Sequence, residues 1–129
     1  MIVVDASALG EALVGRDPDP ALLDAMSGEV SAPDHLHVEV LSALRGLVLG
    51  HKLGAAAAEV ARRDLFALSV NRFDLGPLAD RAWELKDRFT TYDAAYIALA
   101  EALECPLLTC DAKLRAGHRA DVRVVSSTG

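Results

Sequence analysis

The sequence predicts an α/β fold, in which a central, mostly parallel β-sheet carries helices on both faces. Short apolar runs such as residues 2–4 are rich in β-branched side chains and do not alternate, which is typical of strands buried on both faces. Segments with helical periodicity separate these runs, and the clearest of them extends from His35 to Gly50. Strands that alternate with helices favour a three-layer α/β/α architecture.

Composition and charge are those of one globular domain spanning residues 1–129. Hydrophobic residues make up 52% and charged residues 25% of the chain, which excludes an intrinsically disordered protein. The 13 Lys and Arg against 19 Asp and Glu give a net charge of −6, which argues against a protein that coats nucleic acid with clustered basic side chains. Two divalent cations held by carboxylates would add +4 and bring the charge from −6 to −2, so a nucleic-acid substrate stays possible.

The expected elements follow from apolar spacing and from the residues that end each segment. Gly15 and the Asp17–Pro20 segment end the first helix, and Pro77 suits the first turn of a later one. Strands are expected at residues 2–4, 69–73, 107–109 and 122–125, while residues 30–32 are too few to assign. Helices are expected at residues 7–14, 21–26, 35–50, 55–68, 77–88, 90–103 and 111–115.

Membrane insertion and export are not expected. No apolar run approaches the roughly 18 to 20 residues that span a bilayer, and the N-terminus lacks the basic start and cleavage site of a signal peptide. We therefore expect a cytoplasmic protein. Cys105 and Cys110 flank an expected strand that would separate them by about 16 Å, too far for a disulfide, so both are interpreted as reduced thiols.

Two aspartates follow expected strands. Asp5 comes directly after residues 2–4, and Asp111 comes shortly after residues 107–109. Parallel strands place their carboxyl ends at one edge of the sheet, where ligands bind, so both side chains should face the same crevice. Each aspartate could equally cap the helix that follows it.

Two further carboxylates can reach this edge from helices. Asp93 lies in the first turn of a helix that is apolar around nearly its whole circumference, three residues after Thr90, a spacing that also approximates a capping box. Glu39 lies on the flank of the apolar stripe of residues 35–50, where a surface glutamate would look the same. Two carboxylates about 4 Å apart repel by roughly 4 kcal/mol at an effective dielectric near 20, so a cluster of four needs cations. Oxygen ligands favour Mg²⁺ or Mn²⁺, which suits hydrolysis of phosphodiester bonds.

Four segments surround these carboxylates. They are Ile2-Val3-Val4-Asp5-Ala6-Ser7-Ala8-Leu9, Val38-Glu39-Val40-Leu41-Ser42-Ala43-Leu44, Thr91-Tyr92-Asp93-Ala94-Ala95-Tyr96-Ile97-Ala98-Leu99-Ala100 and Leu107-Leu108-Thr109-Cys110-Asp111. These segments resemble the PIN-domain family, and the size of the chain is similar to that of its VapC toxin branch. The resemblance covers essentially the whole chain, and residues 91–100 carry its most specific motif.

The resemblance implies a three-layer PIN-like domain that acts as a Mg²⁺- or Mn²⁺-dependent endoribonuclease. Such a protein is the toxin of a type II toxin–antitoxin pair, forms a homodimer and is silenced by a small antitoxin protein. Ser7 and Thr109 would give polar support beside the site. Many relatives carry another acidic residue where this chain has Lys113, so the number of bound metal ions stays open. The catalytic and metal-binding residues at the matching positions would be Asp5, Glu39, Asp93 and Asp111.

Basic side chains near this edge are candidates for contacts with RNA. Arg88 precedes the turn into the buried helix and could contact a substrate phosphate or pair with a site carboxylate, although an exposed arginine at a helix end would look the same. A second basic group consists of Lys113, Arg115, His118 and Arg119.

Four other interpretations fit the residues less well. A zinc site at His35, His37 and Glu39 lacks a third nitrogen or sulfur ligand, because only the first and last of these share a helix face. A haloacid-dehalogenase-type phosphatase would carry a second aspartate where this chain has Ser7, and a phosphoacceptor receiver would carry paired acidic residues where it has only Asp5. The main alternative is a PIN-like module that binds RNA or protein without cleavage, and the retention of all four carboxylates argues against it.

Overall fold

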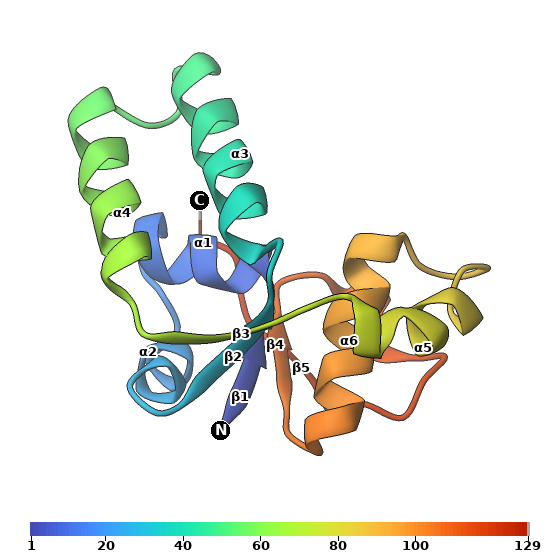
Figure 1. The fold of residues 1–129 in the computed structure, drawn as a ribbon. Helices are drawn as coiled ribbons and strands as arrows, with labels where there is room; N and C mark the ends of the chain where they lie inside the picture. Colours follow the sequence, from blue (N-terminus) through green and yellow to red (C-terminus); the bar gives the residue numbers. More distant parts are fainter. Residues whose placement is uncertain (129) are drawn as a thin grey trace.

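A computed structural model describes residues 1–128 and shows a five-stranded parallel sheet with helices on both sides (Figure 1). The expected three-layer α/β/α class is confirmed. The strands are β1 (Ile2–Val4), β2 (Val30–Pro33), β3 (Val70–Phe73), β4 (Leu107–Thr109) and β5 (Val122–Val124). The α-helices are α1 (Ala6–Val14), α2 (Pro20–Met26), α3 (Leu36–Leu49), α4 (Ala55–Ala67), α5 (Ala79–Glu84) and α6 (Thr91–Leu103), and two short 3₁₀ helices are η1 (Gly76–Leu78) and η2 (Ala112–Arg115).

The strand order reverses direction next to β1. The strands lie in the order β3-β2-β1-β4-β5, and every neighbouring pair is parallel. The chain therefore adds β2 and then β3 on one side of β1. It then crosses the sheet and adds β4 and β5 on the other side of β1. Right-handed crossovers place α1 to α4 on one face and α5 and α6 on the other. The reversal between β1 and β4 is the position at which open α/β sheets bind ligands, beyond the carboxyl ends of the strands.

The core is densest where α6 crosses the centre of the sheet. β1 and β4 are buried along their whole length, and α6 packs against β1, β2 and β4. All seven residues of Ala94–Ala100 are buried, and the four alanines among them let the helix approach the strands closely. This packing fixes the N-terminal turn of α6, with Asp93, at the carboxyl edge of the sheet.

Helices α3 and α4 form an antiparallel pair that extends away from the sheet (Figure 1). Of the predicted apolar stripe of α3, Val40 and Leu44 are buried, and Leu41, Leu47 and Val48 are half-buried. Both helices pack against α1. Glu39 lies beside this stripe at the start of α3, so burial of the stripe brings its carboxylate close to the strand ends.

The helix expected at residues 77–88 is shorter than predicted. Pro77 lies in the 3₁₀ helix η1, and α5 ends at Glu84. Beyond it, the Arg88 N–H donates to the Leu85 carbonyl at 3.1 Å, three residues back instead of four. Leu85 is the last buried residue of the segment, and the tighter turns redirect the chain into α6. The helix expected at residues 111–115 is the 3₁₀ helix η2.

Cys105 and Cys110 are both free thiols, as predicted. Within residues 1–128, no helix combines the length and the apolar character needed to cross a membrane.

Candidate active site

Asp5 is the most buried of the four predicted carboxylates, with 5% of its surface exposed. It follows β1 and caps α1, because its Oδ1 accepts from the Ala8 N–H at 3.0 Å. The same oxygen accepts from Ser7 Oγ at 2.7 Å, and Oδ2 accepts from Thr109 Oγ1 at 2.5 Å. A carboxylate has about four accepting lone-pair positions. Three are therefore occupied, and one on Oδ2 is left for a ligand.

The pKa of Asp5 reflects two opposed effects. Burial raises it above the ordinary aspartate value, while the hydrogen bonds from Thr109, Ala8 and Ser7 act in the opposite direction. The net direction is upward, so the charged form of Asp5 is held at a cost that a bound cation would relieve.

Ser7 and Thr109 tie the ends of β1 and β4 together around Asp5. The Cys110 N–H donates to Ser7 Oγ at 2.9 Å, and the Asp111 N–H donates to Thr109 Oγ1 at 3.0 Å. Each hydroxyl therefore accepts from the backbone after β4 and donates to the carboxylate after β1. This double use fixes the spacing between the strand ends that carry the two aspartates.

Asp93 is held in the first turn of α6. Thr90 is the N-cap, and its Oγ1 accepts from the Asp93 N–H at 3.2 Å. The pKa of Asp93 is raised, first by burial and then by the negative charges of Asp5, Asp111 and Glu39. The other three predicted carboxylates are therefore close enough to Asp93 to act on its charge.

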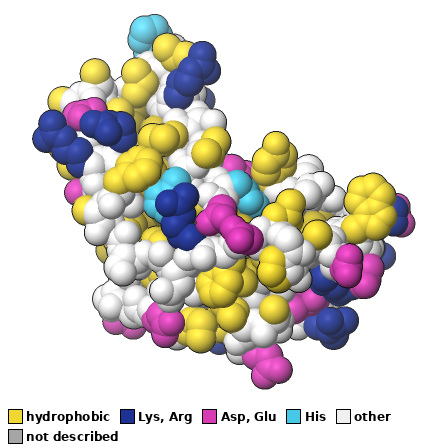
Figure 2. Space-filling view, viewed as in Figure 1, with side chains coloured by type: hydrophobic (Ala, Val, Ile, Leu, Met, Phe, Trp, Pro, Cys, Tyr) yellow, Lys and Arg dark blue, Asp and Glu magenta, His cyan; other side chains and the backbone are white. Residues whose placement is uncertain are grey.

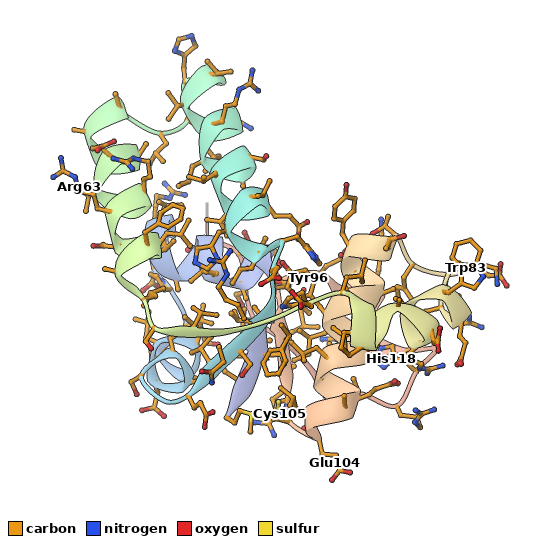
Figure 3. The ribbon with its side chains drawn as sticks, in the orientation of Figure 1. Arg63, Trp83, Tyr96, Glu104, Cys105 and His118 are labelled. Atoms are coloured by element: carbon orange, nitrogen blue, oxygen red, sulfur yellow. The ribbon has the colours of Figure 1, made fainter. Side chains whose placement is uncertain are left out.

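Glu39 is oriented from α6 and from its own helix. Tyr96 Oη donates to Glu39 Oε1 at 2.7 Å, and His35 Nε2 lies 3.4 Å from the same oxygen. Tyr96, labelled in Figure 3, lies between α6 and the start of α3. Burial, followed by the hydrogen bond to Glu39, raises the pKa of Tyr96, so the phenol stays protonated and remains a donor.

Asp111 occupies the position after β4 that its sequence predicted. Its Oδ1 accepts from the Lys113 N–H at 2.9 Å and caps η2. Asp5 and Asp111 thus both serve as helix caps, and the capping interpretation is confirmed for each. Thr109 also links the two residues at the same edge of the sheet.

The four carboxylates fit a divalent cation in donor chemistry and in charge. Within residues 1–128, none of them pairs with Lys or Arg, and Glu39 has only the neighbouring His35. As the side chains stand, no group of three or more His, Cys, Asp or Glu residues in this range is close enough to hold a metal ion. The four carboxylates repel one another, and each has its own hydrogen-bond partners, which accounts for the separation between them. A cation would therefore have to draw the carboxylates together.

Within residues 1–128, none of the predicted basic side chains forms an ion pair with the four carboxylates, although the Lys113 N–H donates to Asp111. The Arg88 side chain packs against Gly117, where an added Cβ would come within 2.9 Å of Arg88 Cδ, and Arg88 forms no ion pair among the described residues. Arg119 pairs with Glu101, and His118 Nδ1 accepts from the Ala120 N–H.

Two residues of this region were missed as functional positions. Tyr96 holds Glu39, yet nothing in its local sequence identifies that partner. By contrast, the sequence does place His35 on the helix face of Glu39, although only as part of a zinc alternative. Glu11 is buried in α1 and accepts from the Thr128 N–H at 2.8 Å, which anchors the C-terminal tail. The sequence did offer a signal for Glu11, because it is the one acidic residue within the apolar helix α1. It borders a cleft of about 660 Å³ between α1 and α3, which Ser7 and Cys110 also line.

Comparison with known proteins defines the class to which this fold and acidic edge belong. The family model of the PIN domain matches residues 2–118, and the chain belongs to the PIN-domain family.

Particular relatives match along nearly the whole chain. The chain is 38% identical over 129 residues to Ribonuclease VapC12 of Mycobacterium tuberculosis (strain ATCC 25618 / H37Rv), covering 98% of this chain and 100% of that protein. Its fold is similar to the crystal structure of M. tuberculosis VapC20, a sarcin-ricin loop cleaving toxin, with a TM-score of 0.68, 20% identity and coverage of 95% and 99%. A toxin–antitoxin complex from Klebsiella pneumoniae shares the fold with a TM-score of 0.60, 19% identity and coverage of 91% and 92%.

Proposed function

We propose that this protein is a divalent-metal-dependent endoribonuclease and the toxin of a toxin–antitoxin pair. The observation that carries the proposal is the placement of four carboxylates, none paired with Lys or Arg in the described residues, after β1 and β4 and in the first turns of α3 and α6. The whole-length likeness to a protein named Ribonuclease VapC12 supports the same activity. RNA is therefore the proposed substrate.

Asp5, Glu39, Asp93 and Asp111 are the proposed ligands of Mg²⁺ or Mn²⁺. When bound, such a cation supplies charge neutralisation at the scissile phosphate and lowers the pKa of a coordinated water. The chain contributes the geometry. Ser7 and Thr109 hold Asp5 in one orientation, and Tyr96 holds Glu39, so these two carboxylates are oriented before a cation draws the four together.

The test is cleavage of RNA by the purified protein. Cleavage should require Mg²⁺ or Mn²⁺, stop with excess EDTA and return when the metal is restored. The products should carry 5′-phosphate and 3′-hydroxyl ends, because attack by water does not use the ribose 2′-OH. Full activity in EDTA, or products ending in 2′,3′-cyclic phosphate, would remove the proposed mechanism.

The proposed partner is a small antitoxin protein, and the proposed assembly is a homodimer acting in the cytoplasm. Expression of the chain alone should arrest growth, and co-expression of a small neighbouring gene product should restore it. Loss of the arrest in an Asp5→Asn variant would tie it to the acidic site. Normal growth in the presence of active, soluble protein would count against the toxin assignment.

A PIN-like module that binds without cleaving remains the second candidate. Binding of RNA with no cleavage in either metal, across a broad RNA pool, would favour it over the nuclease.

A further inference from the structure

An exposed aromatic ring stands directly beside the acidic site. Tyr92 immediately precedes Asp93 in the first turn of α6, and 60% of its surface is exposed. Tyr92 and Tyr96 are four residues apart and share one face of the helix, but Tyr96 is buried. Tyr92 is therefore the aromatic side chain that this face of α6 presents to solvent next to the carboxylates.

The Tyr92 ring is held in place by a chain of aromatic contacts. Its centroid lies 5.5 Å from that of His35, with an interplanar angle of 75°, and His35 in turn lies 4.9 Å from Tyr96 at 71°. Tyr96 donates to Glu39, so the rings form a continuous series from the carboxylate cluster to the surface. A T-shaped contact engages at most one face of a ring, which leaves Tyr92 a free face in a constrained position.

Because the chain is acidic, contacts with RNA that need no positive charge matter for binding at this site. The chain carries a net charge of −6, so it lacks the general attraction that most nucleic-acid-binding proteins have for the phosphate backbone. Figure 2 shows Lys and Arg side chains over the outer parts of α3 and α4 and around α5, with few in the centre of this face. Stacking of a base on an aromatic ring gives affinity without any positive charge.

We propose that Tyr92 forms a nucleobase-stacking subsite, which holds one unpaired base of the RNA next to the phosphate to be cleaved. This inference rests on the proposed nuclease function and adds a substrate requirement to it. A base inside a duplex keeps both faces stacked on its neighbours, so the nucleotide bound at Tyr92 must be single-stranded or extruded.

Kinetics of three variants test the subsite. Stacking binds the substrate and the transition state alike, so Tyr92→Ala should raise KM about tenfold with little change in kcat. Tyr92→Phe keeps the ring and should stay within about twofold of the parent. Trp83→Ala is the matched control, because Trp83 is a 68% exposed aromatic on α5, and Figure 3 shows it pointing away from Tyr96. Its KM should be that of the parent.

Photo-crosslinking supplies a readout that does not depend on cleavage. Single-stranded oligoribonucleotides carrying 5-iodouridine at one position each should crosslink to Tyr92 when that base lies beside the cleavage site, and crosslinking should fall when the same position is paired in a duplex. The experiment uses an Asp111→Asn background to slow cleavage, with metal present. Absence of a Tyr92 crosslink, or parental KM in Tyr92→Ala, would overturn the inference even if the parent cleaves RNA.

Two further outcomes are decisive. A Tyr92 crosslink in a parent protein that cleaves no RNA would support the subsite while rejecting the nuclease. Unchanged kinetics in Tyr92→Ala together with weaker inhibition by a protein partner would overturn the inference and assign the ring to that partner.

Discussion

The Thr109 hydroxyl is the contact on which the geometry of Asp5 depends most. Thr109 is fully buried, donates to Asp5 Oδ2 and accepts from the Asp111 N–H. No other hydroxyl joins the two aspartates in this way within residues 1–128.

Replacement of Thr109 by Val keeps the shape of the side chain and removes both hydrogen bonds. The free energy of unfolding should fall by about 2 kcal/mol, because a buried carboxylate loses a donor, and cleavage should fall about tenfold. Thr109→Ser is the control, since it keeps the hydroxyl and loses one buried methyl group, at about 1 kcal/mol. Urea unfolding and cleavage rates check both variants. Parental cleavage by Thr109→Val would show that the hydroxyl does not position Asp5.

Asp93 gives a pH-dependent prediction. Its folded pKa lies above the ordinary value of 3.8, so the charged form costs stability at neutral pH and the cost disappears as the pH falls through the raised pKa. Asp93→Asn should therefore stabilise the metal-free protein by about 1 kcal/mol at pH 7 after solvent screening, or about 4 °C in Tm. The advantage should shrink as the pH is lowered. An advantage that grows on acidification, measured by melting curves in EDTA, would contradict the charge cluster.

At the scale of elements, the far end of α6 is joined to α5 by an ion pair. Both oxygens of Glu101, whose side chain is 5% exposed, accept from Arg81, at 2.7 and 3.0 Å. Arg81 lowers the pKa of Glu101 more than any other group does. Glu101 therefore serves packing at this end of the apolar helix, whereas Asp93 lies among the proposed site carboxylates at the other end.

Glu101→Gln should lower the free energy of unfolding by about 2 kcal/mol at pH 7. Because the folded pKa lies below the ordinary value of 4.5, this contribution is present above about pH 4.5 and is lost as the pH falls below it. Cleavage should be unchanged per folded molecule, since eight residues of helix separate Glu101 from Asp93 by about 12 Å. Denaturant titrations at pH 7 and pH 4 check the first point, and a cost that is equal at both values would exclude a charged Glu101 as its source.

Several elements were predictable because local signals determine them. The strands β1 and β4 are apolar and show no alternation of polar and apolar residues, which identified them as buried strands. Their parallel pairing brings Asp5 and Asp111 to the same edge of the sheet, as predicted. The end of α5 was not predictable, because Leu85 stops the helix only through its burial in the tertiary structure. The same holds for Glu39, whose orientation depends on Tyr96, 57 residues away.

At the scale of the whole molecule, metal binding should appear as added stability. A ligand that binds only the folded state raises Tm by mass action, so saturating Mg²⁺ or Mn²⁺ should raise the Tm of the parent by several degrees. The increase should be smaller in Asp93→Asn, which loses a proposed ligand. Glu101→Gln is the control and should respond to metal like the parent. Equal shifts in the parent and Asp93→Asn would place the bound metal elsewhere.

The central claim is that the four carboxylates act together as the catalytic site. Asparagine caps helices about as well as aspartate, so Asp93→Asn separates catalysis from capping. We expect its rate of RNA cleavage in saturating Mg²⁺ to fall at least about a hundredfold, a barrier increase of about 2.7 kcal/mol, in a protein that melts no lower than the parent. A rate within threefold of the parent would contradict the claim.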